Sequence, residues 1–129
     1  MIKKALIAGF ANLVLGLVLN MGIGLIIPGV TQEYQNTAIF RPWNDPLMML
    51  YFAYPFILGF VLIHLWNSVK ENAKKSPFEF AKLYFVIATI PGMFITFSSF
   101  QLSLTMILLW TITGFLQAFV AGYIFSKVK

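Results

Sequence analysis

Three long stretches without a charged residue limit what this chain can fold into. No Asp, Glu, Lys or Arg occurs in residues 5–32, 46–69 or 83–126. About 20 consecutive apolar residues are enough for a helix to cross the hydrocarbon core of a bilayer. Charged residues make up only 10% of the chain, whereas soluble domains contain about 25%. We therefore expect an all-α membrane protein, a four-transmembrane-helix bundle formed by residues 1–129 as a single domain.

The number of spans follows from the lengths of these stretches. At 1.5 Å per residue, one helix over residues 83–126 would extend about 66 Å, roughly twice the thickness of the hydrocarbon core. The chain must therefore turn back, and the polar cluster at residues 97–103 predicts where it does so. Ser98 and Gln101 have the spacing of a capping pair, which favours a helix start there. The expected spans cover residues 5–27, 47–67, 83–97 and 102–126.

Capping signals indicate where other helices begin and how far one of them extends. Asp45 precedes a proline, an order typical of an N-cap followed by the first helical position. Ser76 also precedes a proline, and Glu79 three residues later completes a capping box. The second helix is expected to continue beyond the membrane, with Glu71 and Lys75 at the favourable i,i+4 spacing.

The distribution of basic residues predicts the orientation in the membrane. With four spans, both termini and the cytoplasmic loop 68–82 share one side, and the outer loop 28–46 lies on the other. Of the 9 basic residues, only Arg41 falls in the outer loop, and all the others are lysines of the first side. Basic loops stay on the cytoplasmic side of membrane proteins. We therefore expect a multi-pass protein of the cell (inner) membrane, with both termini in the cytoplasm.

The residue types also exclude several functions. The sequence contains no cysteine, which removes disulfides, thiol redox chemistry and thiolate metal sites. The net charge of +5 comes from lysines that adjoin the spans, so no nucleic-acid partner is expected. No catalytic or metal-binding constellation is present, and we expect no enzyme activity, no metal and no cofactor. Lipid chemistry at the outer surface through Glu33, Arg41 and Asp45 would lack a His, a Ser or metal-ligand spacing.

A narrow polar stripe runs along the first span. Gly9, Asn12, Gly16 and Asn20 fall within about 80° of one another on a helix. Helices in a bilayer associate through small residues and interhelical hydrogen bonds. The stripe is therefore either a packing seam, with its amides bonded to other spans, or part of a ligand or ion pocket. Further candidates for this seam or pocket are Thr89, Thr96 and Gln117.

Two other features concern packing between the helices. Pro91 lies near the middle of the third span, where it removes a backbone hydrogen bond and predicts a kink. The fourth span carries Gly114, Ala118 and Gly122 at i+4 spacing, a ladder of small residues that lets another helix approach closely. Packing within the bundle and a homodimer seam are both compatible with this ladder.

The outer loop at residues 28–46 is long for a bundle of this size. Its aromatic residues, among them Trp43, favour a cap that packs on the membrane surface, with an ion pair between Glu33 and Arg41. Asp45 closes the loop at the start of the second span. The alternative is that the loop forms the lid or mouth of a binding site.

His64 is the only residue whose side chain titrates near neutral pH without a large shift. It falls within about one turn of the cytoplasmic end of the second span. Anchoring at the lipid headgroups is the simpler interpretation, and proton relay or ligand contact is the alternative. A single histidine without a carboxylate partner does not predict a metal site.

Over its whole length, with its Pro28-Gly29 and Arg41–Pro46 elements, the sequence resembles the small uncharacterised four-span proteins of bacterial inner membranes. The resemblance implies the topology and no particular activity. The chain differs from four-span proton-coupled multidrug exporters, which need a membrane-embedded glutamate in the first span. Residues 5–27 contain asparagines and no acid.

Two functions fit these features best. The first is a non-catalytic structural, accessory or oligomer-forming subunit, whose partners are membrane lipids and either its own copies or another membrane protein. The second is a small facilitative transporter or binder of a neutral or lipid-like molecule, held between helices by Asn12, Asn20, Thr96 and Gln117. Convergence of the amides on a cavity favours the second function, and a dry contact between helices favours the first.

Overall fold

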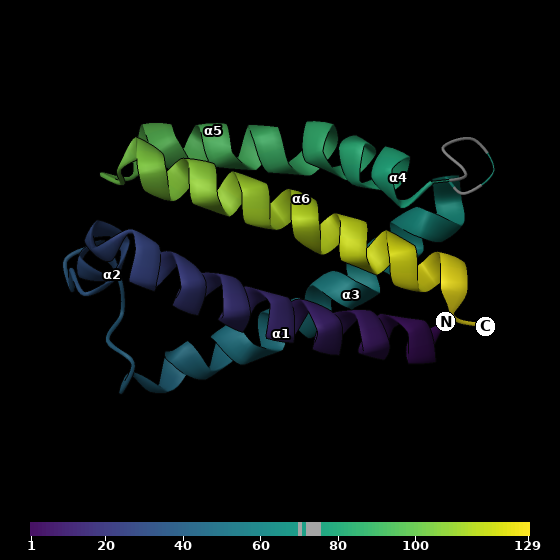
Figure 1. Cartoon of the computed structure of the whole chain (residues 1–129), viewed down its shortest axis with the longest axis horizontal. Coiled ribbons are helices and arrows are strands. Elements are labelled where there is room, and N and C mark those ends of the chain that lie inside the picture. The colour runs from purple at the N-terminus through teal and green to yellow at the C-terminus, as the bar shows by residue number, and fades with distance from the viewer. Residues whose placement is uncertain (70, 72–75) are drawn as a thin grey trace.

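The computed structural model confirms four long apolar helices, each able to cross a membrane (Figure 1). It describes residues 1–69, 71 and 76–129, and no strand occurs among these residues. The third span, Pro77–Ser99, is continuous through three elements. The elements in chain order are α1 (Ile2–Ile26), α2 (Pro28–Tyr34), η1 (Pro46–Met49), α3 (Leu50–Val69), α4 (Pro77–Tyr84), η2 (Phe85–Thr89), α5 (Ile90–Ser99) and α6 (Leu104–Lys127).

The spans form two pairs, and both chain ends lie at the same end of the bundle (Figure 1). α1 packs mainly against α3, and α4 packs mainly against α6. α6 also packs against α1, and this contact joins the two pairs. We call the end with Met1 and Lys129 the termini end. The opposite end, which holds α2 and residues 35–45, is the loop end.

The closest helix crossing in the bundle lies between α1 and α3. A Cβ atom on Gly59 would lie 2.5 Å from the backbone oxygen of Ala5 and 3.1 Å from the nitrogen of Gly9. A Cβ on Gly9 would meet the Cα of Phe56 at 2.8 Å. These contacts involve backbone atoms, which cannot move aside as a flexible side chain does. Glycine therefore sets the separation of α1 and α3, as expected where membrane helices associate by close packing.

The small residues of α6 pack within the bundle. A Cβ on Gly114 would lie 3.2 Å from a methyl carbon of Thr89, and one on Gly122 would lie 2.9 Å from the ring of Phe80. Ala118, between these glycines, is fully buried. The ladder therefore lets η2 and α4 approach α6 within the bundle.

The termini end contains a large cluster of buried apolar residues. Leu62 and Ile63 of α3 meet Phe80 of α4 there, and all three side chains are buried. The ring of Trp66 packs edge-on against Phe80, with centroids 5.1 Å apart. The Lys4 ammonium donates to the backbone oxygen of Phe125 at 3.3 Å, placing a cation near the C-terminus of α6, where the helix dipole favours it. The buried members of the cluster are Ala5, Ala8, Leu58, Leu62, Ile63, Phe80, Ala121 and Phe125.

Two of the expected helix starts are confirmed. The Asp45 carboxylate accepts from the Leu47 amide at 2.9 Å, and a proline follows it at the first helical position. The Ser76 hydroxyl accepts from the Glu79 amide at 3.2 Å. The expected continuation of the second helix to Lys75, with its i,i+4 pair, falls on residues 70 and 72–75, outside the described part of the chain.

The start of α6 differs from the prediction. The N-cap is Ser103, whose hydroxyl accepts from the Met106 amide at 3.2 Å, rather than Ser98 with Gln101. Glu33 of α2 supplies the reason, because its carboxylate accepts from the Ser103 amide at 2.7 Å and from the hydroxyl at 2.6 Å. A carboxylate beside the first turn of a helix is stabilised by the helix dipole.

The expected ion pair between Glu33 and Arg41 is also wrong. Glu33 binds Ser103, and the Arg41 guanidinium lies 3.0 Å from the carboxylate of Asp45 instead. Asp45 is four residues away from Arg41, so this pair forms locally. The outer loop is therefore held at two points. Glu33 of α2 connects it to the start of α6, and Arg41 connects it to the start of η1.

Pro91 is accommodated by a change of helix type. The five residues before α5, Phe85–Thr89, form the π-helix η2, in which the Ile90 amide donates to the Phe85 oxygen five residues earlier. The wider turn takes up the hydrogen-bonding defect that a proline causes in an α-helix. The sequence predicted a simple kink, whereas the structure places a π-segment at this position. π-segments occur frequently at functional sites.

Candidate ligand-binding cavity

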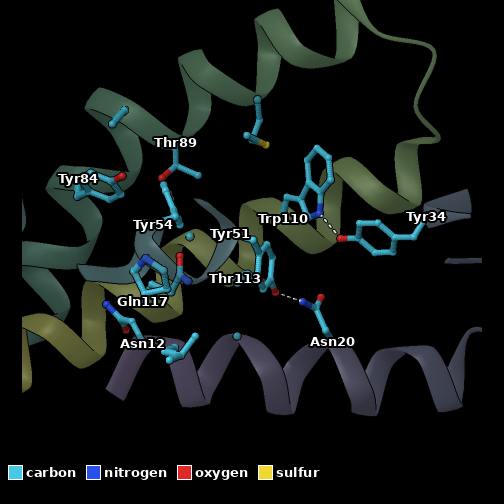
Figure 2. A pocket seen from close by; sticks show the side chains of 16 residues that line it. Asn12, Asn20, Tyr34, Tyr51, Tyr54, Tyr84, Thr89, Trp110, Thr113 and Gln117 are labelled. Carbon is cyan, nitrogen blue, oxygen red and sulfur yellow. Dashed lines mark hydrogen bonds between the residues drawn. The ribbon is translucent and has the colours of Figure 1, made fainter. Parts of the chain in front are cut away.

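A cavity of about 410 Å³ lies between the two helix pairs, in the middle of the bundle (Figure 2). We call it the central cavity. Its volume falls within the range of about 300–1,000 Å³ typical of small-molecule sites. None of its lining residues is Asp, Glu, Lys, Arg or His. The polar and aromatic lining residues are Asn12, Asn20, Tyr34, Tyr51, Tyr54, Tyr84, Thr89, Trp110, Thr113 and Gln117.

Asn12 is the most unusual residue of this cavity. Its side chain is 0% exposed, yet neither its Nδ2 nor its Oδ1 has a hydrogen-bond partner among the residues that the structure describes. A buried polar group without a partner costs about 1–3 kcal/mol. In native proteins such exceptions are explained by strain, by a functional role or by a bound water or ion. Asn12 lines the central cavity, and its carboxamide has an unused donor and an unused acceptor.

α6 and η2 supply the facing polar groups. Gln117 is largely buried, and its Nε2 lies 4.0 Å from the position of a Cβ on Gly16 across the cavity. The Thr113 hydroxyl donates to the Leu109 backbone oxygen at 2.8 Å, so only its acceptor capacity remains. Thr89 is buried beside α6 and belongs to the π-segment. The cavity therefore presents uncharged donors and acceptors from both helix pairs.

Two hydrogen-bonded pairs border the central cavity toward the loop end (Figure 2). Asn20 of α1 donates through Nδ2 to the Tyr51 hydroxyl of α3 at 2.6 Å. Trp110 of α6 donates through Nε1 to the Tyr34 hydroxyl of α2 at 2.6 Å. Each pair joins two different helices, and both tyrosines act as acceptors.

A second space of about 580 Å³, the loop chamber, lies beyond these pairs. Residues of the loop contribute Phe40, Arg41 and Trp43 to its lining. The Trp43 ring packs edge-on against Tyr51, with centroids 5.6 Å apart. Apart from Arg41, the chamber is lined by uncharged residues, most of them apolar or aromatic.

Tyr34 anchors the loop over the bundle. Its ring lies 5.0 Å from that of Phe40 and 6.4 Å from that of Trp110, measured between centroids. Burial raises the pKa of the Tyr34 phenol above its ordinary value, although the hydrogen bond from Trp110 opposes this shift. The hydroxyl therefore remains protonated and uncharged at neutral pH, which suits the absence of charge in the cavity lining.

The structure brings most of the predicted polar residues together. Asn12, Gly16 and Asn20 line the central cavity, whereas Gly9, the first member of the same stripe, packs against α3. The stripe is therefore a helix contact at one end and a cavity wall along the rest. From the other spans, Thr89 and Gln117 reach the same cavity.

Thr96 is the exception among the predicted residues. Its hydroxyl donates to the Gly92 backbone oxygen at 2.7 Å, and it does not line the central cavity. The cavity wall formed by the third span ends at Met93, about one turn before Thr96.

Sequence reasoning missed the tyrosines of this site. Tyr34, Tyr51, Tyr54 and Tyr84 line the cavity from three different elements. Aromatic residues with a polar tip are common at membrane interfaces, so their presence in an apolar chain did not mark a pocket. The available signal was the position of Tyr51 and Tyr54 beside Pro55 in the second span.

The remaining candidate residues lie outside the central cavity. Asp45 has a pKa below its ordinary value, because its carboxylate accepts from the Leu47 amide and from Arg41. Trp43 and Arg41 line the loop chamber, and Glu33 binds the start of α6. The structure therefore gives Glu33, Arg41 and Asp45 partners within the fold.

His64 lies on the exposed surface of α3. Its Nδ1 is 2.7 Å from the backbone oxygen of Phe60, one turn earlier, so this nitrogen carries the proton that it donates. His64 does not line the central cavity. Within residues 1–69, 71 and 76–129, no three His, Asp or Glu side chains come together as a metal site requires.

This chain matches no protein-family model, no curated protein and no solved structure.

Proposed function

We propose that this protein binds a small uncharged molecule in the central cavity, within the membrane, without changing it chemically. The fully buried carboxamide of Asn12, with both polar atoms unpartnered, carries this proposal. A protein that used the polar stripe only for packing would satisfy these atoms across the helix contact. A bound molecule with one acceptor and one donor satisfies both.

The lining favours a neutral ligand over an ion. The cavity contains amides and hydroxyls and no formal charge, and an unpaired charge in a low-dielectric site is strongly disfavoured. Much of the remaining lining is apolar, including Leu13, Pro55 and Met93. The ligand class that fits both features has an amide-like or hydroxyl group on an apolar body.

The contacts of the small residues favour this proposal over a purely structural subunit. Gly114 and Gly122 of α6 and Gly59 of α3 are occupied by contacts within the bundle. They are therefore not free to form a close seam with another copy. Facilitated passage of the same ligand across the membrane is the finer form of the proposal.

We also propose that both termini lie in the cytoplasm and that the loop end lies outside, in the inner membrane of a bacterial cell. The concentration of lysine at the termini end supports this orientation. Reporter fusions at residue 129 and within residues 36–38 test it. Equal activity of a cytoplasm-specific reporter at both positions would contradict it.

Benzamide is a suitable probe for the binding proposal, and benzoate is its charged counterpart of nearly the same shape. A ligand that binds only the folded state raises thermal stability by an amount that grows with the ratio of its concentration to its Kd. We expect benzamide to raise the unfolding temperature of the detergent-solubilised protein, and benzoate to leave it unchanged. Asn12→Leu should abolish the benzamide effect.

Gly22→Ala is the matched control, because a Cβ on Gly22 meets no atom within 4 Å. This variant should respond to benzamide as the wild type does. Equal responses of the wild type and Asn12→Leu would show that benzamide acts elsewhere and would overturn the assignment. A wild type that responds to neither compound would overturn it as well.

A further inference from the structure

The central cavity and the loop chamber share part of their walls. Four residues line both spaces, and they are Asn20, Tyr34, Tyr51 and Trp110. These are the same four residues that form the two hydrogen-bonded pairs toward the loop end. The boundary between the two spaces therefore consists of side chains that form hydrogen bonds with each other.

This boundary is weaker than the closure at the termini end. There, α1 and α3 are held at backbone contact by Gly59 and Ala5, and the fully buried Leu62 fills the space next to them. Opening that end requires separating two helices. Opening the loop-end boundary requires only new rotamers of Asn20 and Tyr51, or of Trp110 and Tyr34. Rotamer changes of accessible side chains take picoseconds to nanoseconds, much faster than helix motions.

We propose that the Asn20–Tyr51 and Trp110–Tyr34 pairs form a gate through which a neutral ligand moves between the loop chamber and the central cavity. The ligand itself is the one of the proposed function, on which this inference rests. The gate also selects for its chemistry. A molecule with a donor and an acceptor replaces the hydrogen bonds that it breaks in passing, whereas a purely apolar molecule leaves the amide, the indole and the two phenol groups unpaired.

Access from the surrounding lipid is the competing route. Tyr54 lines the central cavity and is also 52% exposed. It shares its helix face with Ile57 and Val61, which are exposed and face outward from α3. A side opening near Tyr54 would let a ligand enter from the bilayer without passing the gate, and the experiment must separate the two routes.

The natural absence of cysteine allows a direct test of access. Gly16→Cys places a single thiol in the central cavity, where a Cβ meets only Gln117, at 4.0 Å. The rate at which uncharged N-ethylmaleimide modifies this thiol in the detergent-solubilised protein measures how often the cavity is open. We expect Tyr51→Phe and Tyr34→Phe, each added to Gly16→Cys, to raise the rate about fivefold. Each substitution removes one hydrogen bond, worth about 1 kcal/mol, and keeps the ring.

Thr31→Cys is the control, because Thr31 is exposed and lines the loop chamber, on the other side of the gate. Its modification rate should be the same with and without the tyrosine changes. Unchanged Gly16→Cys rates in both Tyr→Phe backgrounds would overturn the gate. Tyr54→Trp, which enlarges the side chain beside the side opening, tests the competing route. If this change slows the modification of Gly16→Cys and the Tyr→Phe changes do not alter it, the reagent enters from the side and the gate is overturned.

This experiment contains no ligand, so its failure is distinct from failure of the proposed function. Faster modification without any benzamide effect would support the gate and remove the ligand assignment. A benzamide effect that requires Asn12, together with unchanged modification rates, would support the binding site and overturn the gate.

Discussion

The helices pack closely at the termini end of this bundle, whereas they leave spaces between them toward the loop end. At the termini end, Ala5 and Ala8 of α1 are fully buried against α3 and α6, and the neighbouring space is filled by the large side chains of Leu62 and Phe80. Toward the loop end, the same helices line spaces of about 410 and 580 Å³, both partly open to the outside of the bundle. Lipid offers no hydrophobic drive between helices, so close packing at one end must hold the bundle together.

One face of α1 forms both the close contact and the cavity wall. Near the termini it carries Ala5 and Gly9, which allow backbone contact with α3. Further along it carries Asn12, Gly16 and Asn20, which face the cavity. The difference shows that small residues alone do not determine tight packing. What matters is whether the opposite helix offers a glycine, such as Gly59, or large rings that hold the helices apart.

The largest expected effect comes from placing a methyl group at the tight crossing. Gly59→Ala puts a Cβ 2.5 Å from the Ala5 backbone oxygen, and overpacking against rigid neighbours costs about 3 kcal/mol. The free energy of unfolding in mixed detergent and SDS micelles measures this loss. Gly22→Ala, which meets no atom within 4 Å, should be as stable as the wild type or slightly more stable. Equal stability of the two variants would contradict the comparison.

The second prediction concerns the central cavity, where replacing an unpartnered polar side chain with an apolar one should stabilise the fold. Asn12→Leu keeps the branching and the number of heavy atoms of the side chain and removes two unpartnered polar atoms, so it should raise the free energy of unfolding by about 1–3 kcal/mol. Asn20→Leu is the matched comparison, because Asn20 donates to Tyr51 and its loss should lower stability by about 1 kcal/mol. Destabilisation by Asn12→Leu would indicate that its amide is already satisfied.

The architecture was largely predictable from local sequence. Charge-free stretches located the four spans, and the Asp45 and Ser76 caps identified two helix starts because each acts within three residues. The start of α6 was not predictable in this way. Ser103 is selected as its cap together with Glu33, which lies 70 residues earlier in the chain, and no local pattern contains that contact.

The candidate site was predictable only in part for a related reason. Periodicity placed Asn12, Gly16 and Asn20 on one face of α1, since a regular helix fixes those angles. It could not determine that tyrosines of other helices stand opposite this face and leave a cavity. For Thr96 a shared helix face was not enough, because the cavity wall formed by the third span ends about one turn earlier, at Met93.

A smaller effect is expected at the contact that fastens the loop end. Glu33→Gln replaces one carboxylate acceptor of the Ser103 pair with an amide donor, which should weaken this contact by about 1 kcal/mol. Hydrogen exchange at the first amides of α6 should become faster, with little change in global stability. Glu79→Gln removes an exposed partner of Lys82 at the termini end and should leave exchange in α6 unchanged. No difference between the variants would mean that Glu33 does not hold the loop.

The smallest expected effect is a pH response of the same loop. The Leu47 amide and Arg41 lower the pKa of Asp45 below its ordinary value of 3.8 in the folded state. This group therefore contributes stability that is fully present above pH 3.8 and is lost as the pH falls through the lower, folded value. Trp43, on the same loop, reports the change through its fluorescence. Asp45→Asn keeps an N-cap oxygen and removes the titration, so the acid response of the wild type should be reduced in this variant. An identical acid response would show that the loop end is not held by the Arg41–Asp45 pair.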